Sequence, residues 1–288
     1  MKPSRKFLTR RNFLVALGLG GVGSIADAHW VEPHWLGVGR HEIKFAKSRK
    51  QSPLKILQLS DFHLSPAVDL SFIKESIELG IALKPDLICL TGDFITAGCN
   101  PVDRYIQTLS LLSQCAPTFA CLGNHDGGRW AGAHRGFKDT EFIQSLLKKA
   151  GVVLLHNTMQ TVRVRDWNLT LVGLGDAWAE EMLPEIAFAP LPASRGDVTI
   201  VLSHNPDTKT QLQPYEWDLM LCGHTHGGQV RLPLIGTPFA PVRDKNFVEG
   251  LHYWNSRWIH ITRGVGNLHG VRFNCRPEVS LLTLTSPL

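Results

Sequence analysis

Five short apolar runs in this chain each end in a cluster that contains Asp, Asn or His. The runs span residues 54–59, 87–91, 118–122, 198–203 and 217–222. The clusters are Asp61-Phe62-His63, Gly92-Asp93, Gly123-Asn124-His125-Asp126, Ser203-His204-Asn205 and Gly223-His224-Thr225-His226. Apolar runs that end in Gly-containing polar loops are typical of buried strands. Because open α/β sheets gather ligand sites at the carboxyl ends of their strands, we expect these clusters to form one site.

Helical patterns separate the early runs, over residues 71–83, 102–115 and 140–150. This half of the chain is therefore predicted to alternate strand and helix. Further along, consecutive strands are predicted at residues 152–155, 160–165, 168–174, 252–254, 258–262 and 279–284, and near Val230. We expect them to form a second, more antiparallel sheet. The predicted fold class is α/β, a layered α/β/β/α sandwich of two mixed sheets flanked by helices.

The composition fits one folded domain without a nucleic-acid partner. Of the 288 residues 43% are apolar, and the 26 Gly and 17 Pro follow no period, which excludes collagen-like, coiled-coil and disordered classes. The net charge of +5 is confined to the N-terminus, because residues 1–50 contain 10 Lys and Arg against 3 Asp and Glu. The remainder has 20 basic and 22 acidic residues. Such a body lacks the basic surface that nucleic-acid binding requires.

The six cysteines do not favour a disulfide framework. They form no close C-x-x-C pair, and Cys89, Cys121 and Cys222 lie inside apolar, strand-like runs. We therefore interpret them as small buried apolar residues and not as a disulfide framework.

The N-terminus has the pattern of an export signal. Arg10-Arg11 precedes an apolar run over residues 13–26, which ends in the small-residue pattern Ala26-Asp27-Ala28. The run is shorter than the roughly 20 residues of an ordinary spanning helix. The paired arginines indicate the twin-arginine export machinery, which carries folded proteins.

These features predict a protein exported to the periplasm or to the outer face of the membrane. Residues 1–28 are then a cleaved twin-arginine signal peptide, or an uncleaved anchor that holds the protein to the membrane through residues 13–26. If the anchor is retained, Trp30 and Trp35 would contact the membrane surface. The alternative is that both tryptophans pack locally against the fold. We expect residues 29–53 to be an N-terminal extension with a flexible join over 40–53, and residues 54–288 to be the folded domain.

The donor types in the five clusters suit two divalent metal ions. Carboxylate oxygens, imidazole nitrogens and one amide oxygen are ligands for Mn, Fe, Zn or Mg, and availability decides among these metals. In an extended Asp61-x-His63 segment both side chains share one face. His224-x-His226, in a turn, can direct its two rings to neighbouring ions. Asp93 is the natural bridge, because a carboxylate has two oxygens.

The complete pattern resembles the calcineurin-like metallophosphoesterase superfamily, whose Asp-x-His, Gly-Asp, Gly-Asn-His-Asp/Glu, His and Gly-His-x-His motifs run here from about residue 54 to 230. The resemblance implies the metallophosphoesterase fold for residues 54–288. It implies a first metal bound by Asp61, His63, Asp93 and His226, and a second bound by Asp93, Asn124, His204 and His224. It assigns catalytic roles to His125, which faces the leaving group, and to Asp126, which is placed to orient the His125 ring.

This resemblance leads us to expect a dinuclear metal-dependent phosphodiesterase that cleaves a phosphodiester or pyrophosphate bond with a metal-bridging hydroxide. Two cations about 3.5–4 Å apart can acidify the shared water and offset phosphoryl charge. A histidine near its ordinary pKa of about 6.5 can protonate the leaving group. The substrate would be a small molecule or a lipid.

Candidate substrate contacts follow His125 directly. Arg129 and Trp130 in a Gly-rich loop, and Arg263 further along, are predicted to contact phosphate or the group attached to it, although an ordinary solvated loop is the alternative.

Two other functions remain open. One is a UDP-2,3-diacylglucosamine pyrophosphatase of lipid A biosynthesis, which would require an inward-facing anchor. The other is a non-catalytic envelope protein with a metal core, against which the presence of Asp93 and His125 counts.

Overall fold

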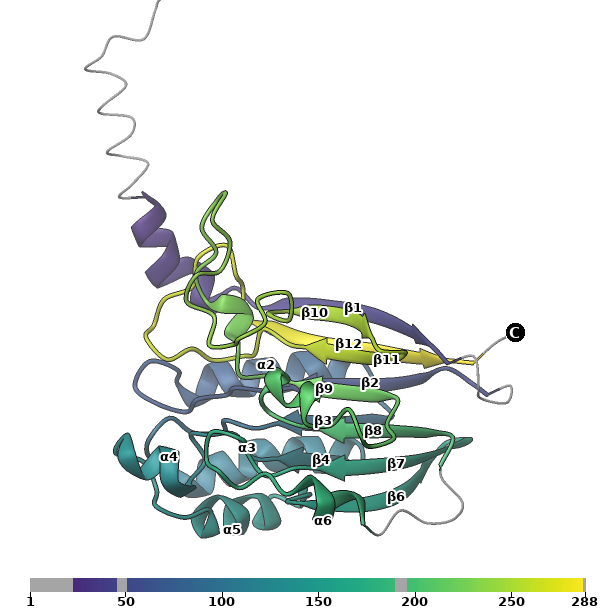
Figure 1. Cartoon of the computed structure of the whole chain (residues 1–288). Coiled ribbons are helices and arrows are strands. Elements are labelled where there is room, and N and C mark those ends of the chain that lie inside the picture. The colour runs from purple at the N-terminus through teal and green to yellow at the C-terminus, as the bar shows by residue number, and fades with distance from the viewer. Residues whose placement is uncertain (1–22, 46–50, 190–195, 287–288) are drawn as a thin grey trace, which may run out of the picture.

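The computed structural model describes residues 23–45, 51–189 and 196–286. Within them, two six-stranded mixed sheets lie face to face, and helices flank them (Figure 1). The predicted α/β fold is confirmed. The predicted signal peptide or anchor lies largely in residues 1–22, outside the described residues. In the part of the chain that is described, no helix has the length and apolar character needed to cross a membrane.

The first sheet carries three of the five polar clusters. Its strand order is β1-β12-β2-β3-β4-β5. The strands are β1 (Gly37–Lys44), β2 (Leu54–Leu59), β3 (Leu87–Thr91), β4 (Thr118–Cys121), β5 (Val153–Leu154) and β12 (Glu278–Thr285). Parallel neighbours need crossover connections, and helices α2 (Leu70–Ala82), α3 (Val102–Cys115) and α5 (Glu141–Lys149) occur in these. Because β2, β3 and β4 are parallel, their carboxyl ends meet at one edge of the sheet.

The second sheet carries the other two clusters. Its strand order is β10-β11-β9-β8-β7-β6. The strands are β6 (Thr158–Val164), β7 (Trp167–Gly173), β8 (Val198–Leu202), β9 (Leu219–Cys222), β10 (Gly250–Trp254) and β11 (Arg257–Ile261). The four central strands are parallel, and antiparallel hairpins close both edges. Among the described residues, its outer face packs against Ala187 and Phe188 of α6 (Pro184–Phe188) and against Leu212 and Trp217, which follow η3 (Pro206–Thr210).

Burial on both faces explains why the central strands are mostly apolar. On β2, Leu57 and Leu59 pack against α2 and α3, whereas Leu54 and Ile56 face the second sheet. Alternate side chains point to opposite faces, so a strand buried on both sides has few polar positions, and the buried Gln58 of β2 donates hydrogen bonds to Thr91 and Cys222. Removing each such Leu or Ile from water contributes about 1.5–3 kcal/mol.

Several predicted strands are placed differently in the structure. The strands predicted at 152–155 and 279–284 are β5 and β12, and both belong to the first sheet and not to the second. Val230 forms only an isolated bridge with Phe273. Residues 40–44 are not a flexible join, because they continue β1, which pairs in parallel with β12. The pairing was not visible in the sequence because β1 contains two glycines and four polar residues, with Ile43 its fully buried apolar side chain.

The N-terminal segment packs against residues 272–276. It contains the short helical turns η1 (Asp27–Val31) and η2 (Glu32–His34). The buried Glu32 carboxylate accepts hydrogen bonds from the backbone N–H groups of Asn274 and Cys275. Arg276 donates to the Trp35 carbonyl oxygen at 2.9 Å, and its guanidinium lies 4.0 Å from the Trp35 ring centre. Trp35 thus contacts Arg276 while 56% of the residue stays exposed, and whether it also contacts a membrane stays a prediction.

In the structure the six cysteines are unpaired, and Cys115 is exposed and Cys99 partly buried, unlike the buried residues that were predicted. Cys89, Cys121 and Cys222 are buried, and burial raises the pKa of each of these thiols.

Candidate metal centre

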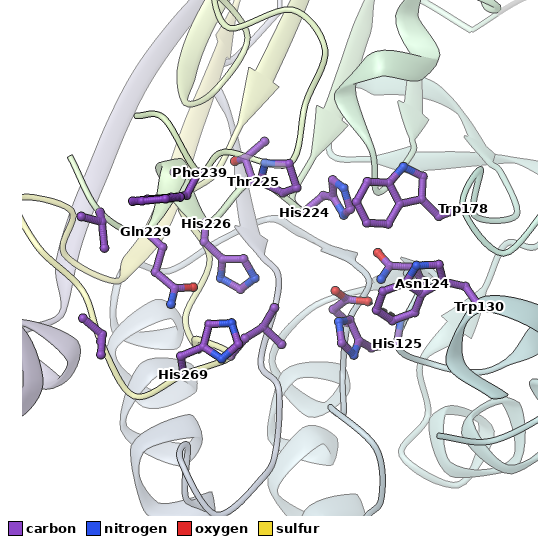
Figure 2. A pocket seen from close by; sticks show the side chains of 16 residues that line it. Asn124, His125, Trp130, Trp178, His224, Thr225, His226, Gln229, Phe239 and His269 are labelled. Atoms are coloured by element: carbon purple, nitrogen blue, oxygen red, sulfur yellow. Dashed lines mark hydrogen bonds between the residues drawn. The ribbon is translucent and has the colours of Figure 1, made fainter. Parts of the chain in front are cut away.

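The five polar clusters converge at the carboxyl ends of β2, β3, β4, β8 and β9, as predicted. The seven predicted metal ligands are all buried, with at most 4% of any residue exposed. Part of this site is drawn in Figure 2, where Asn124 and His224 lie near one another and His226 lies further along the same pocket. Two groups consist only of predicted ligands, and a third joins His63 and Asp93 to His125.

The first group consists of Asp61, His63 and His226. Nε2 of His226 lies 3.4 Å from Oδ1 of Asp61 and 3.2 Å from Nε2 of His63. Burial lowers the pKa of His63 to about 3 and holds that of His226 well below its ordinary value, so both rings are neutral. Neutral imidazoles and a carboxylate that converge in this way form a site suited to a divalent cation.

The second group consists of Asp93, His204 and His224. Nδ1 of His204 lies 2.6 Å from the Thr91 carbonyl oxygen, which leaves Nε2 directed toward the site. That Nε2 is 3.1 Å from Oδ2 of Asp93, and the same carboxylate oxygen is 3.3 Å from Nε2 of His63. Asp93 therefore lies between the two groups, where its bridging role was predicted.

Three of the atoms predicted to bind the second metal have no hydrogen-bond partner. Within the described residues these buried atoms are Oδ1 of Asn124, Nε2 of His204 and Nε2 of His224. An unsatisfied buried polar atom costs about 1–3 kcal/mol. A metal ion would satisfy all three atoms, so the residues present fit the metal that their types suggest.

The backbone at the ligands is strained. Asp61, His63, Asp93, His224 and His226 all have positive φ, between 48° and 69°. Non-glycine residues rarely adopt this conformation, and each instance costs on the order of 1–3 kcal/mol. The prediction that Asp61 and His63 lie in an extended segment is therefore wrong. Their side chains nevertheless converge, with Nε2 of His63 3.9 Å from Oδ1 of Asp61.

Two glycines leave room for the ligand carboxylates. A Cβ at Gly123 would collide with the side chain of Asp93, and a Cβ at Gly223 would collide with Asp61. These positions need glycine for space, because the backbone of one loop approaches a ligand held by another.

Asp126 has a different role from the one predicted. Its carboxylate accepts hydrogen bonds from the backbone N–H groups of Asp93, Phe94 and Gly123, at 2.7–2.8 Å. It thus fastens the loop after β3 to the loop after β4. Burial, with the neighbouring Asp93 carboxylate, raises the pKa of Asp126 to about 8, although the N–H donors oppose this shift.

The His125 ring is oriented by a backbone carbonyl and not by Asp126. Nδ1 of His125 lies 2.9 Å from the Thr96 carbonyl oxygen. The Nδ1–H donates to this oxygen, so Nε2 is the nitrogen left for exchange with a substrate. The His125 backbone N–H donates to Oδ1 of Asp93 at 2.9 Å, which places the ring beside the metal centre.

A cavity of about 420 Å³ opens beside the ligands and His125 (Figure 2). Its other walls are largely apolar, formed by Trp130, Trp178, Val230, Phe239, Leu268 and Val271. Trp130 meets His125 edge-on at 4.5 Å between ring centres and stacks on His134 at 3.9 Å. Trp178 meets His224 edge-on at 4.3 Å. Trp130 was predicted as a substrate contact, whereas Trp178 and His269 line the cavity from loops without a recognisable motif.

The two predicted arginine contacts lie outside the cavity lining. Arg129 is exposed and forms an ion pair with Glu180. Arg263 donates from Nε to Oε2 of Glu278 at 2.6 Å. Both cations are therefore engaged with carboxylates.

The buried Arg272 supports the metal centre from behind. It donates to the carbonyl oxygens of Arg263 and Gly266, at 2.8 and 2.5 Å. The Gly266 carbonyl also lies 3.3 Å from Nδ1 of His226. Arg272 thus fixes the loop that orients a ligand histidine.

Comparisons with known proteins agree with this site. The family described as calcineurin-like phosphoesterase matches residues 54–228. The chain is 44% identical to the phosphodiesterase YaeI of Escherichia coli (strain K12) over 281 residues, which cover 96% of this chain and 99% of the relative. It is 31% identical to the metallophosphoesterase YkuE of Bacillus subtilis (strain 168), covering 98% and 99%. It is 30% identical to the UDP-2,3-diacylglucosamine pyrophosphatase LpxG of Chlamydia trachomatis serovar D, covering 88% and 91%.

The family match spans most of the chain and includes all five clusters. The protein is therefore a metallophosphoesterase and belongs to the calcineurin-like phosphoesterase family.

Proposed function

We propose that this protein is an exported, dinuclear metal-dependent phosphodiesterase that cleaves a phosphodiester or pyrophosphate bond. The observation that carries the proposal is the position of Asp93, whose Oδ2 lies within 3.3 Å of a histidine nitrogen in each of the two ligand groups. Asp61, His63, His226 and Asp93 would hold the first ion. Asp93, Asn124, His204 and His224 would hold the second.

When bound, two divalent cations supply an acidified water and positive charge beside the phosphoryl oxygens. His125 then supplies the proton that the departing oxygen requires. The Thr96 carbonyl accepts the Nδ1–H in both charge states of the ring, so Nε2 is the nitrogen that donates. Asp126 acts indirectly, because its three backbone hydrogen bonds fix the loops that carry Asp93 and His125 relative to each other.

The apolar cavity walls favour a substrate with an aromatic or acyl portion next to the phosphorus. Trp130 and Trp178 offer flat apolar surfaces to a substrate. The Trp130 ring contacts His125, and the Trp178 ring contacts His224. The same walls support a second candidate function, a pyrophosphatase for a nucleotide-linked lipid such as UDP-2,3-diacylglucosamine, which is the substrate in the name of LpxG.

The full-length chain, loaded with manganese in mild detergent, should hydrolyse bis(4-nitrophenyl) phosphate faster than 4-nitrophenyl phosphate. Asp93→Ala should abolish this turnover. Metal binding without turnover of either ester would contradict the proposal that the protein is a phosphodiesterase. Turnover of UDP-2,3-diacylglucosamine would then support the pyrophosphatase, and inactivity on that compound too would support the non-catalytic alternative.

We further propose export by the twin-arginine route and attachment to the membrane surface. Trp30 is 73% exposed, and Leu234 and Ile235 project into solvent from the loop between β9 and β10. Figure 1 shows this green loop on the side of the molecule where the purple N-terminal segment lies. Large exposed apolar side chains near the N-terminal end of the described residues suit a lipid interface.

The Arg10→Lys, Arg11→Lys double variant tests the export route. We expect it to remain in the cytoplasm, while the wild-type protein fractionates with the periplasm or the membrane. Equal distribution of the two proteins would contradict the proposal.

A further inference from the structure

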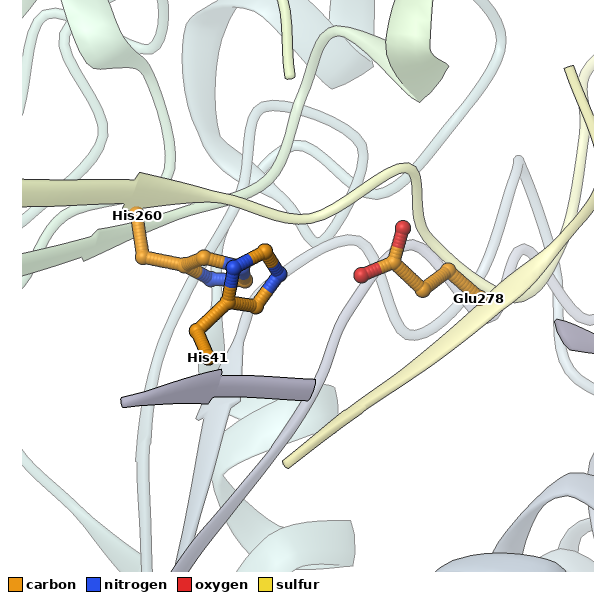
Figure 3. A group of neighbouring side chains, drawn as sticks. All are labelled: His41, His260 and Glu278. Carbon is orange, nitrogen blue, oxygen red and sulfur yellow. The ribbon is translucent and has the colours of Figure 1, made fainter. Parts of the chain in front are cut away.

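A second group of side chains that could hold a metal ion lies between the two sheets, apart from the candidate metal centre (Figure 3). His41 is on β1, Glu278 is on β12 and His260 is on β11. One ligand atom from each of the three lies within 4.8 Å of the other two. The rings of His41 and His260 are 4.5 Å apart, centre to centre. The group therefore joins an edge of the first sheet to the second sheet.

His260 presents an unpartnered nitrogen to this group. Its Nδ1 lies 2.7 Å from Oε1 of Gln58, and the Gln58 amide N–H donates to Thr91 and to the Cys222 carbonyl. Oε1 is thus an acceptor and Nδ1 carries the proton. Burial holds the pKa of His260 well below its ordinary value, so Nε2 is a bare lone pair. Although His260 is fully buried, this Nε2 accepts no hydrogen bond from any described residue.

The carboxylate of Glu278 is held in place by its neighbours. Ser280 donates to Oε1 and Arg263 donates to Oε2, both at 2.6 Å. Each carboxylate oxygen keeps a second lone pair for a ligand. A Cβ at position 39 would collide with Oε1, so Gly39 of β1 provides the space that this carboxylate occupies.

His41 gives the group access to solvent, because it is only partly buried. Burial, aided by Arg263 and opposed by Glu278, lowers the pKa of His41, so the ring is neutral at pH 7 and able to coordinate. None of the three residues lines the cavity beside His125. The group is therefore separate from the candidate metal centre.

We propose that His41, His260 and Glu278 bind a zinc ion that ties β1 and β12 to β11. Two imidazole nitrogens and one carboxylate oxygen are a zinc ligand set, with water as the fourth ligand reached from the His41 side. The Gln58, Ser280 and Arg263 contacts supply the outer hydrogen bonds that orient such ligands. The ion would stabilise the edge of the sandwich, and the proposal does not depend on the phosphodiesterase.

The test uses the metal-stripped full-length chain, equilibrated with zinc alone and analysed for bound zinc per chain. We expect His41→Ala to bind one ion fewer than the wild-type protein. Glu278→Gln, which keeps the side-chain shape, should show the same loss. The matched control is His252→Ala, a partly buried histidine on β10 outside the group, which should bind as many ions as the wild type.

A second measurement separates this site from the phosphoesterase ligands. In an Asp93→Ala background, saturating zinc should still raise the Tm by about 5 °C or more, and adding His41→Ala should make that rise smaller. Equal zinc content and equal Tm shifts with and without His41 would overturn the proposal. His41, His260 and Glu278 would then form a polar contact that binds no metal. Because both readouts are binding readouts, absence of phosphodiester turnover would not affect the conclusion.

Discussion

The carboxylate of Asp126 accepts a hydrogen bond of 2.8 Å from the backbone N–H of Asp93. Through Phe94 and Gly123 it also holds the strand ends of β3 and β4 together. Asp126→Ala should therefore destabilise the metal-free protein by about 3–5 kcal/mol, because three buried N–H donors lose their acceptor. Chemical denaturation measures this change, with the exposed Asp103→Ala as the control. If Asp126 instead oriented the His125 ring, kcat would fall while stability stayed unchanged.

Asp93→Ala should affect both ligand groups at once, because one carboxylate oxygen lies near both His63 and His204. We expect bound manganese to fall from two ions per chain to one or none, and kcat/KM to fall by about 10³-fold or more. Asn124→Ala removes a ligand atom from one group only, so it should release no more than one ion. Metal analysis of the two variants side by side makes the comparison. Retention of two ions in Asp93→Ala would exclude the bridging role.

Much of this centre was predictable because its ligands come from short motifs at strand ends. Parallel strands bring their carboxyl ends together regardless of loop conformation. The positions of Asp61, His204 and His226 therefore followed from the polar clusters at the ends of apolar runs. The role of Asp126 did not, because its partners are backbone N–H groups that no side-chain motif encodes. Trp178 and His269 lie in loops without periodicity, and only the fold brings them to the cavity.

The strand β1 shows the same limit at the level of the fold. Its partner β12 lies some 240 residues further along the chain, pairing Gly37 with Glu278. Local residue pattern decides whether a segment can be a strand, but a distant partner decides whether it is one. The polar residues of β1 looked like a linker until this partner was known.

Trp130→Ala and Trp178→Ala should each raise KM for an aryl phosphodiester about tenfold, since each removes an aromatic wall of the cavity. Dimethyl phosphate offers no aromatic or acyl portion, and the change for this diester should be much smaller. Steady-state kinetics on both diesters provide the measurement, with the exposed Tyr253→Ala as the control. An equal change for the two diesters would show that the walls do not select the substrate.

Acid should destabilise the metal-free protein through His260. Its pKa in the folded state lies well below the ordinary 6.5, so the unfolded chain binds a proton that the folded chain does not. Stability from this group is present above pH 6.5 and is lost as the pH falls below it. His260→Gln should make the loss between pH 6.5 and 5.5 smaller by about 1 kcal/mol. Urea unfolding at both pH values tests this, and a variant that parallels the wild-type protein would contradict it. The exposed His29→Gln is the control.

Gly123→Ala tests whether the backbone of one loop must approach the ligand held by the next. The added Cβ would collide with the Asp93 carboxylate, so this carboxylate must move away from His63 or His204. We expect metal affinity to fall by about 10–100-fold, as it does when groups that orient a ligand are disturbed. Titration against a competing chelator measures the affinity. The control is Gly98→Ala, where a Cβ meets no atom within 4 Å and binding should not change. Unchanged affinity in a folded Gly123→Ala protein would mean that Asp93 can shift without loss of either ion, and that its position between the two ligand groups is not required for binding.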